Sequence, residues 1–406
     1  MSILSKDFTF IDLFSGIGGF HFAMKKFSSD SQCVFSSEIN DKANKLYSLN
    51  FGINSNYDIT KIDPQRIPNF DVLCAGFPCQ PFSKAGFQNG FEDTRGTLFF
   101  EIIRIIKSKI ESGNKPKILI LENVRNLATH DDHKTWSIIR HSLVEIGFNV
   151  IEKPLILSPK DFGTPQLRDR AIIVAVDSEI FSDYMDFSIS KATKSMTLFS
   201  ILETETDNLK KTYGISDYER KVLSAWDAFI KNLGVRTIGF PIWSDEFGQF
   251  YPIDDLPKWK QNFISKNREL YHNNKSMIDK WKIKYEIDTF IKTHRKFEWQ
   301  AGNTINSVYE GLIQFRPSGV RVKRPDYAPT LVAMAHIPII GKYKRYITPR
   351  EAARLQSLPE DFHFDSVGDD IYRLLGNAVN VDVIYNVFKQ FVDFLDKKQI
   401  TNHQPT

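Results

Sequence analysis

The sequence has few cysteines and no long apolar segment. Among 406 residues only three are cysteines, Cys33, Cys74 and Cys79, and none forms a CxxC pair, so neither a disulfide framework nor a zinc site of that kind is expected. No apolar run approaches the roughly 20 residues of a membrane-spanning helix, and residues 1–10 lack the basic and then apolar layout of a signal peptide. We therefore expect a reduced, intracellular protein that holds no metal.

The sequence also lacks a strong charge of either sign. Its formal net charge is +4 at pH 7, with 42% hydrophobic and 25% charged residues, as in an ordinary globular protein. So mild a charge permits a nucleic-acid partner without requiring one. The length suffices for one large domain and a second, smaller one.

The first 180 residues alternate strand-like and helix-like segments with short gaps. The strand-like runs are 8–14, 33–39, 71–77, 117–124, 148–157 and 171–177, and the helix-like runs are 19–27, 41–51, 97–110 and 136–147. Strands separated by helices imply a parallel sheet with helices on both faces, and continuous apolar strands fit burial on both faces. We predict an α/β fold with a doubly wound, Rossmann-like sheet.

The strand–helix rhythm ends near residue 185. We expect a catalytic and cofactor-binding domain over 1–185 and a smaller domain over 186–344, where the chain is polar and irregular. Within the second segment, residues 256–300 carry 11 Lys and Arg against 5 Asp and Glu. Three tryptophans are interleaved with these charges, namely Trp259, Trp281 and Trp299.

Helix signals return after residue 344. Thr348 is suited to cap a helix that starts at Pro349, with Glu351 closing a capping box. A last helix is expected over about 380–398. We therefore predict that residues 345–406 form a hinge and C-terminal helices that return to the first domain.

Three glycines follow the first predicted strand. Gly16, Gly18 and Gly19 would let the backbone turn tightly in front of a helix N-terminus, but their spacing is not the GxGxxG pattern of dinucleotide sites. Glu38 ends the second strand, where it can accept hydrogen bonds from both hydroxyls of a ribose, and Asp58 can reach an adenine amino group after a third, short strand. The alternative is that the glycines only shape a turn. The two acids favour a nucleoside without a phosphate tail.

Cys79 lies just beyond a predicted strand, between two prolines. Doubly wound sheets bind ligands at that edge, so Cys79 is a candidate nucleophile, whereas Cys33 and Cys74 lie inside strand patterns and fit a role as buried filler. The segment 78–96 contains three glycines and is expected to form a mobile lid.

Polar residues also accompany two further strands. Glu122 ends the strand at 117–124, although a helix cap or a salt-bridge partner is a plainer interpretation of it. Gln166, Arg168 and Arg170 precede the strand at 171–177, and the two arginines share a face if the strand begins at the first of them.

Together these motifs resemble those of the DNA (cytosine-5)-methyltransferases, in that family's order and over both ends of the chain. The compact chain resembles the bacterial restriction–modification branch. The segments that carry the resemblance are DLFSGIGGF (12–20), Glu38, Asp58 with Ile59, GFPCQPFS (76–83), ENV (122–124), QLRDR (166–170), REAARLQSLP (350–359) and LGNAV (375–379).

The resemblance implies S-adenosylmethionine as methyl donor and double-stranded DNA as substrate. The Cys79 thiolate would attack C6 of a flipped-out cytosine, Glu122 would act on N3 and the exocyclic amine, and Arg170 would hold the O2 edge with Arg168 nearby. The implied cofactor residues are Phe14, Gly16, Gly18, Gly19, Glu38, Asp58, Ile59, Pro78, Leu98 and Asn377. The implied DNA-binding residues are Gln80, Ser83, Gln166 and Thr330.

In this family the segment that corresponds to 186–344 carries target recognition. The basic bias of 256–300 and its tryptophans favour DNA contact, although most charge-rich stretches are solvated surface. We expect a monomer in a bacterial cytoplasm, associated with the nucleoid through DNA and not with a membrane. A cognate restriction endonuclease is an expectation only.

Two other functions stay open. A transfer-RNA cytosine-5 methyltransferase shares the catalytic motifs, but the long segment 186–344 speaks against it. A non-catalytic DNA-binding protein with the same fold would not need Cys79, Glu122 and Arg170. A nicotinamide-dependent oxidoreductase fails on the glycine spacing.

Overall fold

The computed structural model describes residues 2–78, 98–192, 196–234, 238–331, 336–364 and 367–402. The chain divides into two compact units. Unit 1 comprises Met1–Met196 with Ala353–Thr406, and unit 2 comprises Thr197–Ala352. Within the described ranges, no helix has the length and apolar character needed to cross a membrane.

A seven-stranded sheet forms the centre of unit 1 and confirms the predicted α/β fold. Its order is β2-β1-β3-β4-β8-β5, with β6 paired to β8. The chain steps from β1 to β2 in one direction and from β3 to β4 in the other, so the sheet is doubly wound and reverses between β1 and β3. The strands are β1 (Thr9–Leu13), β2 (Gln32–Ser37), β3 (Val72–Ala75), β4 (Ile118–Val124), β5 (Phe148–Val150), β6 (Leu155–Leu157) and β8 (Arg170–Asp177).

The prediction of a fully parallel sheet was wrong for one strand. β1, β2, β3 and β4 pair in parallel, whereas β8 runs antiparallel to β4, β5 and β6. Between β6 and β8 the chain forms only a short 3-10 turn, Pro159–Phe162, and the two-residue strand β7 (Gln166–Leu167). A parallel pair needs a longer crossover, usually a helix, so β8 returns in the opposite direction.

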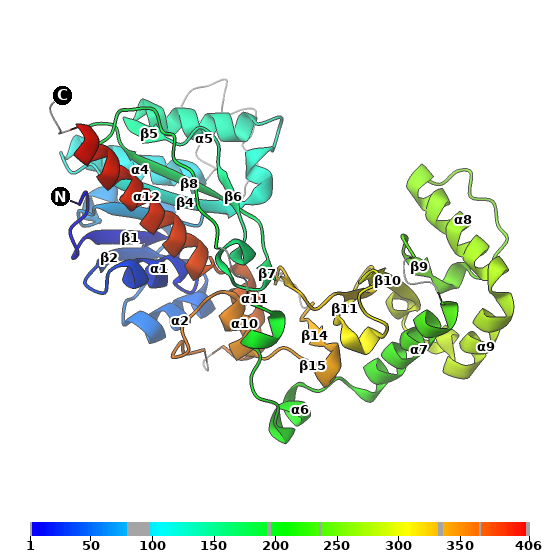
Figure 1. Ribbon diagram of the computed structural model, residues 1–406. Coiled ribbons are helices and arrows are strands. Elements are labelled where there is room, and N and C mark those ends of the chain that lie inside the picture. Colours follow the sequence, from blue (N-terminus) through cyan, green and yellow to red (C-terminus); the bar gives the residue numbers. More distant parts are fainter. Residues whose placement is uncertain are drawn as a thin grey trace. The chain divides into compact units, whose positions relative to one another are not determined.

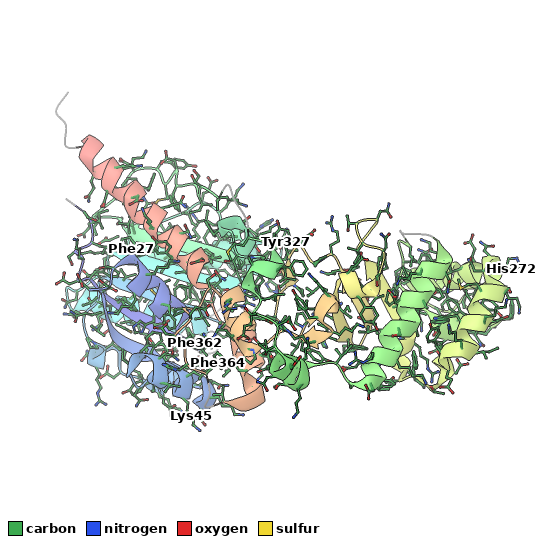
Figure 2. The ribbon with its side chains drawn as sticks, turned by 60° about the horizontal axis from the view of Figure 1, so that its bottom comes forward. Phe27, Lys45, His272, Tyr327, Phe362 and Phe364 are labelled. Atoms are coloured by element: carbon green, nitrogen blue, oxygen red, sulfur yellow. The ribbon has the colours of Figure 1, made fainter. Side chains whose placement is uncertain are left out.

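Helices cover both faces of the sheet. The crossovers from β1 to β2 and from β3 to β4 run in opposite directions along the sheet. Because parallel crossovers have the same hand, their helices lie on opposite faces of the sheet. Helix α12 packs along α1 (Figure 1), and Phe388 of α12 meets Phe27 of α1, labelled in Figure 2, edge-on with ring centroids 4.9 Å apart. The helices are α1 (Gly19–Phe27), α2 (Asp41–Phe51), α4 (Leu98–Glu111), α5 (Lys134–Glu145), α11 (Ile371–Asn377) and α12 (Val381–Asn402).

Unit 2 is built on a six-stranded sheet with the order β15-β14-β11-β12-β10-β9. Trp226 of α7 stacks on Phe297 of β10 with ring centroids 4.7 Å apart, at the centre of an aromatic core. The strands are β9 (Ile242–Trp243), β10 (Lys296–Gln300), β11 (Leu312–Arg316), β12 (Gly319–Lys323), β14 (Ile339–Ile340) and β15 (Arg345–Tyr346). The helices include α6 (Asp207–Tyr213), α7 (Asp217–Leu233), α8 (Lys258–Asn273) and α9 (Lys275–Tyr285).

Two of the three tryptophans within 256–300 belong to this core. Trp281 is 3% exposed and Trp299 8%, whereas Trp259 is 59% exposed. The indole of Trp281 donates to the carbonyl of Ala225. Side chains alternate across a strand and recur every three to four residues along a helix, so lysines and tryptophans that are neighbours in sequence point in different directions. Trp281 and Trp299 are therefore core residues, and contact of the segment 256–300 with DNA stays a prediction.

The helix predicted after residue 348 begins where its sequence signals indicate. In α10 (Pro349–Leu355) the Glu351 carboxylate accepts from the backbone N–H of Thr348 at 2.8 Å, and the Thr348 hydroxyl accepts from that of Glu351 at 3.1 Å. The same carboxylate holds the fully buried Arg345 through two hydrogen bonds, of 2.7 and 2.9 Å. This buried pair ties α10 to β15.

Candidate active site

The glycine turn and an acidic side chain meet at the edge of the unit 1 sheet. The chain leaves β1 through two left-handed residues, Phe14 (φ 55°) and Gly16 (φ 53°). Glu38, directly after β2, accepts from the backbone N–H of Gly16 at 2.9 Å through Oε2 and from that of Asn40 at 2.8 Å through Oε1. Each carboxylate oxygen keeps a second lone pair, so Glu38 can still accept from a ligand hydroxyl.

At the two other glycines of the turn, close neighbours leave no room for a side chain. A Cβ on Gly18, whose φ is 91°, would lie 2.2 Å from the ring of Phe51. A Cβ on Gly19 would lie 2.3 Å from the carbonyl oxygen of Val379. Gly16, by contrast, has no atom within 4 Å of where a Cβ would stand. Phe51 and Val379 therefore pack closely against the turn, whereas space is open beside Gly16, next to Glu38.

Asp58 caps a short turn rather than ending a strand. Its carboxylate accepts from the backbone N–H and the hydroxyl of Thr60 and pairs with Lys61 at 3.0 Å. The hydrogen bonds from Thr60 and then Lys61 lower the pKa of Asp58. The predicted third strand is reduced to a single bridge between Glu38 and Asn56, because the 3-10 turn Ile59–Lys61 follows at once.

The remaining predicted cofactor residues differ in exposure. Ile59 is 3% exposed, and its carbonyl accepts from Arg104 of α4 at 2.8 Å. Leu98 is the half-buried first residue of α4, and Asn377 is the exposed last residue of α11. Pro78 is also exposed.

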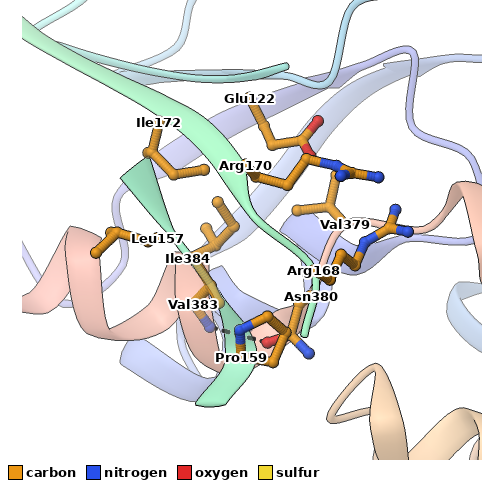
Figure 3. Close-up of a pocket in the computed structure, with 10 residues that line it drawn as sticks. All are labelled: Glu122, Leu157, Pro159, Arg168, Arg170, Ile172, Val379, Asn380, Val383 and Ile384. Atoms are coloured by element: carbon orange, nitrogen blue, oxygen red, sulfur yellow. Dashed lines mark hydrogen bonds and ion pairs between the residues drawn. The ribbon is translucent and has the colours of Figure 1, made fainter. Parts of the chain in front are cut away.

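Glu122 and Arg170 form a pair at the end of β4. Nε of Arg170 lies 2.9 Å from Oε1 of Glu122, with side chains 19% and 11% exposed. Burial raises the pKa of the Glu122 carboxyl, and the charges of Arg170 and Arg168 oppose the rise. Figure 3 shows the pair beside Val379, above a cavity of about 10 Å³ that has room for roughly one water molecule. Burial favours the protonated carboxyl of Glu122 and the guanidinium of Arg170 favours the ionised one, so Glu122 is suited to exchange a proton.

Arg168 has different contacts from Arg170. Its Nη1 donates to the carbonyl of Gly376 and its Nη2 to that of Ala378, each at 2.8 Å. Its guanidinium is buried, and burial and then the charge of Arg170 lower the pKa of Arg168 to about 9. Since β8 begins at Arg170, the two arginines do not share a strand face. Arg168 therefore fixes the backbone at the end of α11 and directly after it. Val379, in this segment, lies against Gly19.

The backbone that leads to residue 79 lies against Glu122. The Nδ2 of Asn123 donates to the carbonyl of Phe77 at 2.9 Å. A Cβ on Gly76 would lie 3.2 Å from Val379 and 3.9 Å from Oε2 of Glu122. Gly76, Asn123 and Val379 lie within the motifs at 76–83, 122–124 and 375–379, but the motifs alone predicted no role for them. Cys79, Gln80 and Ser83 fall outside the described residues.

The two other predicted DNA-binding residues have different surroundings. Gln166 is fully buried, and its Oε1 accepts from Nε2 of Gln356 at 3.4 Å. Thr330 is half-buried, in unit 2, just after strand β13 (Ala328–Pro329).

The fold and this edge define a Rossmann-like methyltransferase with a buried carboxylate–guanidinium pair. Residues 8–393 match the family model described as C-5 cytosine-specific DNA methylase. The chain is 30% identical to the type II methyltransferase M.AluI of Cellulosimicrobium cellulans over 97% of its own length and 93% of that protein. It is 36% identical to M.HgiCI of Herpetosiphon aurantiacus over 92% and 95%.

Solved structures agree at the level of the fold. The methyltransferase EhMeth of Entamoeba histolytica covers 96% of this chain with a TM-score of 0.57 at 17% identity, and the match spans 99% of that chain. The chain belongs to the C-5 cytosine-specific DNA methylases. It is a DNA (cytosine-5)-methyltransferase, and the resemblance seen in its motifs is confirmed.

Proposed function

We propose that this chain transfers a methyl group from S-adenosylmethionine to C5 of a cytosine flipped out of duplex DNA, through a bond between Cys79 and C6. The observation that carries the proposal is the buried pair of Glu122 and Arg170. It lies near the backbone that leads to Cys79, because a Cβ on Gly76 would stand 3.9 Å from Oε2 of Glu122. A general acid and a nucleophile from neighbouring strand ends would then reach one pyrimidine ring from two sides.

The residues at the end of β1 and β2 fit a nucleoside cofactor. The open side of the turn at Gly16 lies next to the Glu38 carboxylate, which can accept from ribose hydroxyls, and no phosphate has to be held there. S-adenosylmethionine would supply the electrophilic methyl group at this site. The residues that we propose to hold it are Phe14, Gly16, Gly18, Gly19, Glu38, Asp58, Ile59, Pro78, Leu98 and Asn377.

Cytosine C5 is a weak nucleophile, and the side chains at this edge can activate it. The Cys79 thiolate would add to C6, which places the electron pair of the C5–C6 double bond on C5. Glu122, whose pKa burial raises, would donate a proton to N3 and neutralise the ring. After C5 has taken the methyl group, a base would remove the C5 proton, and the C5–C6 double bond would re-form as the Cys79 thiolate leaves. N3 would return its proton to Glu122.

The two arginines would have separate roles. Arg170 orients Glu122 through its Nε and can present its remaining N–H groups to the O2 edge of the base. Arg168, bonded to two backbone carbonyls, would act as a positioning residue that fixes the backbone of 376–379. Gln166, whose Oε1 accepts from Nε2 of Gln356, is proposed as a DNA contact by motif position.

The target base must leave the duplex to reach this edge. Extrusion costs a few kcal/mol, which contacts from the segment 78–96 would offset. By motif position, Gln80, Ser83 and Thr330 are proposed to contact the DNA. We propose target recognition for residues 186–344, catalysis for 1–185, and a hinge with returning helices for 345–406.

The biological setting follows from the relatives named above, which are type II methyltransferases. We propose that this chain protects DNA within a bacterial restriction–modification system, as a monomer in the cytoplasm, with a cognate endonuclease as functional partner.

Labelled methyl transfer to duplex DNA tests the proposal. Wild-type protein should label DNA and not total transfer RNA, and Cys79→Ser should abolish labelling while the variant still binds DNA. A duplex with 5-fluorocytosine should trap wild-type protein covalently, because the C5 fluorine cannot leave as a proton does. Full activity of Cys79→Ser would overturn the mechanism, and preferential labelling of transfer RNA would overturn the substrate.

A further inference from the structure

The central strands of the unit 2 sheet have one apolar and one charged face. On β10, β11 and β12 the residues facing the core are apolar, and those between them are mostly polar or charged, as the alternation of a strand requires. The core face carries Phe297, Trp299, Ile313, Phe315, Val320 and Val322. The opposite face carries Lys296, Glu298, Gln300, Gln314, Arg316, Arg321 and Lys323, together with the buried Leu312.

Strand register brings the cations of this face together. Arg321 of β12 is opposite Gln314 of β11 and Glu298 of β10. Lys323 is two residues farther along β12, and Arg316 is opposite Gly319, at the hairpin end of β11. Residues on one face of adjacent strands at such positions are close neighbours. We call Arg316, Arg321 and Lys323 the sheet-face cations.

Anionic partners on this face are too few for its cations. Glu298 is the one carboxylate of the charged face named above, and its Oε2 accepts from Nε and Nη2 of Arg321 at 2.7 and 2.6 Å. Nη1 of Arg316 is buried and has no hydrogen-bond acceptor among the described residues. Buried donors are almost always paired, so this nitrogen is suited to an acceptor from a ligand.

The cations of this face also repel one another. Burial and then the charges of Arg321 and Arg316 lower the pKa of Lys323, and burial and then Arg321 lower that of Arg316. All three sheet-face cations are half-buried, so water compensates them less than it does an exposed lysine. A bound anion would offset both the repulsion between these cations and their incomplete solvation.

We propose that this charged face of β10, β11 and β12 binds duplex DNA, with Arg316 and Lys323 on phosphates and Arg321 reading a base edge. The inference rests on the proposed function and specifies where unit 2 would touch its substrate. Phosphate contacts give affinity without sequence preference, whereas a guanidinium reads sequence when two parallel donors meet a base.

Arg321 is suited to a base edge because Glu298 holds it from one side. Nε and one N–H of Nη2 point to the carboxylate, and the second N–H of Nη2 and those of Nη1 form the opposite edge of the guanidinium. That edge matches the two acceptors O6 and N7 of guanine. A fixed guanidinium loses little side-chain freedom on binding.

Helix α8 offers a competing basic surface within unit 2. It carries Lys258 and Lys260, and Figure 2 shows its His272 far from Tyr327, which follows β12. Exposed lysines on a helix are compensated by water and need no ligand. Helix α8 also has guanidinium nitrogens like that of Arg316, because Nε and Nη2 of its Arg268 are buried without a hydrogen-bond acceptor among the described residues. The feature that favours the sheet face is that strand register gathers Arg316, Arg321 and Lys323 around one carboxylate, that of Glu298.

Binding to duplex DNA as a function of salt distinguishes the two surfaces. Arg316→Gln and Lys323→Gln should each weaken binding for all sequences and lower the salt slope by about 1. The double variant Lys258→Gln with Lys260→Gln should leave the affinity for DNA and the salt slope unchanged. The exposed Lys45→Gln of α2 is the matched control and should also leave both quantities unchanged. A loss from the α8 variant equal to or larger than that from the sheet-face variants would overturn the proposal.

Sequence preference tests Arg321 separately. Arg321→Lys keeps the charge but not the paired donors, so the preference of methylation for its recognition sequence over a single-base mismatch should fall on the order of 5- to 100-fold. The affinity of Arg321→Lys for DNA that lacks the recognition sequence should stay within about twofold of the wild-type value. An unchanged preference would overturn the base-reading role.

The failure of this inference differs from that of the proposed function. If wild-type protein methylates DNA but folded sheet-face variants, checked by circular dichroism, bind and discriminate as it does, only the sheet-face assignment fails. If wild-type protein does not methylate DNA, the proposed function itself fails.

Discussion

Nε of Arg170 lies 2.9 Å from Oε1 of Glu122, and water reaches little of either side chain. Burial favours the neutral carboxyl of Glu122 and the adjacent guanidinium favours its anion, and the net effect is a raised pKa. A carboxyl balanced in this way can donate a proton to a ring nitrogen and take it back within one turnover.

Replacement of Glu122 by glutamine should slow methyl transfer without unfolding the site. Glutamine can still accept from Arg170 but cannot supply a proton, so we expect the single-turnover rate to fall about 100- to 10,000-fold. S-adenosylmethionine affinity should be unchanged, because Glu38 and Gly16 lie at a different strand end. The exposed Glu111→Gln of α4 is the control, and a near-wild-type rate for Glu122→Gln would exclude Glu122 as the acid.

The raised pKa of Glu122 predicts a pH effect with a definite sign. The Cys79 step needs a thiolate and gains from rising pH, whereas the Glu122 step needs a bound proton. The rate should therefore decline as pH rises through the raised pKa of Glu122, and this alkaline decline should be absent from the residual activity of Glu122→Gln. Single-turnover rates between pH 5 and 9 measure it. The same decline in both proteins would assign it to another group.

Arg168 and Arg170 should affect different properties when mutated. Arg168→Met leaves the carbonyls of Gly376 and Ala378 without their donor, so the free energy of unfolding should fall by about 2–4 kcal/mol. Arg170→Gln should change stability less and methyl transfer more. Guanidinium chloride unfolding and single-turnover kinetics compare the two. A stable but inactive Arg168→Met protein would show that Arg168 meets the substrate.

Gly19→Ala tests the contact between the glycine turn and the segment after α11. The added methyl would meet the carbonyl oxygen of Val379 at 2.3 Å, and relief of the clash should cost about 1–3 kcal/mol. Displacement of 376–379 should also raise the KM for S-adenosylmethionine. Gly113→Ala, at a φ of 73° with open space around it, is the control: it should lose stability with no change in KM.

Local sequence patterns predicted the helices well. Those expected over 19–27 and 41–51 have the same bounds in α1 and α2, and Glu351 closes the expected capping box. Such features depend on residues a few positions apart, which the sequence displays directly. The direction of β8 depends instead on whether the chain between β6 and β8 is long enough to cross the sheet, and strand patterns alone do not reveal that.

The order of motifs along the chain identified the family and the chemistry, because nucleophile, carboxyl and guanidinium each follow a recognisable strand. Only folding decided which side chains meet: Arg168 turned to the carbonyls after α11 while Arg170 met Glu122. Folding also buried Trp281 and Gln166 and gathered Arg316, Arg321 and Lys323 on one sheet face. These contacts join residues from separate elements, and their energies depend on three-dimensional packing and on shielding from water, neither of which is encoded in the spacing of residues along a strand or helix.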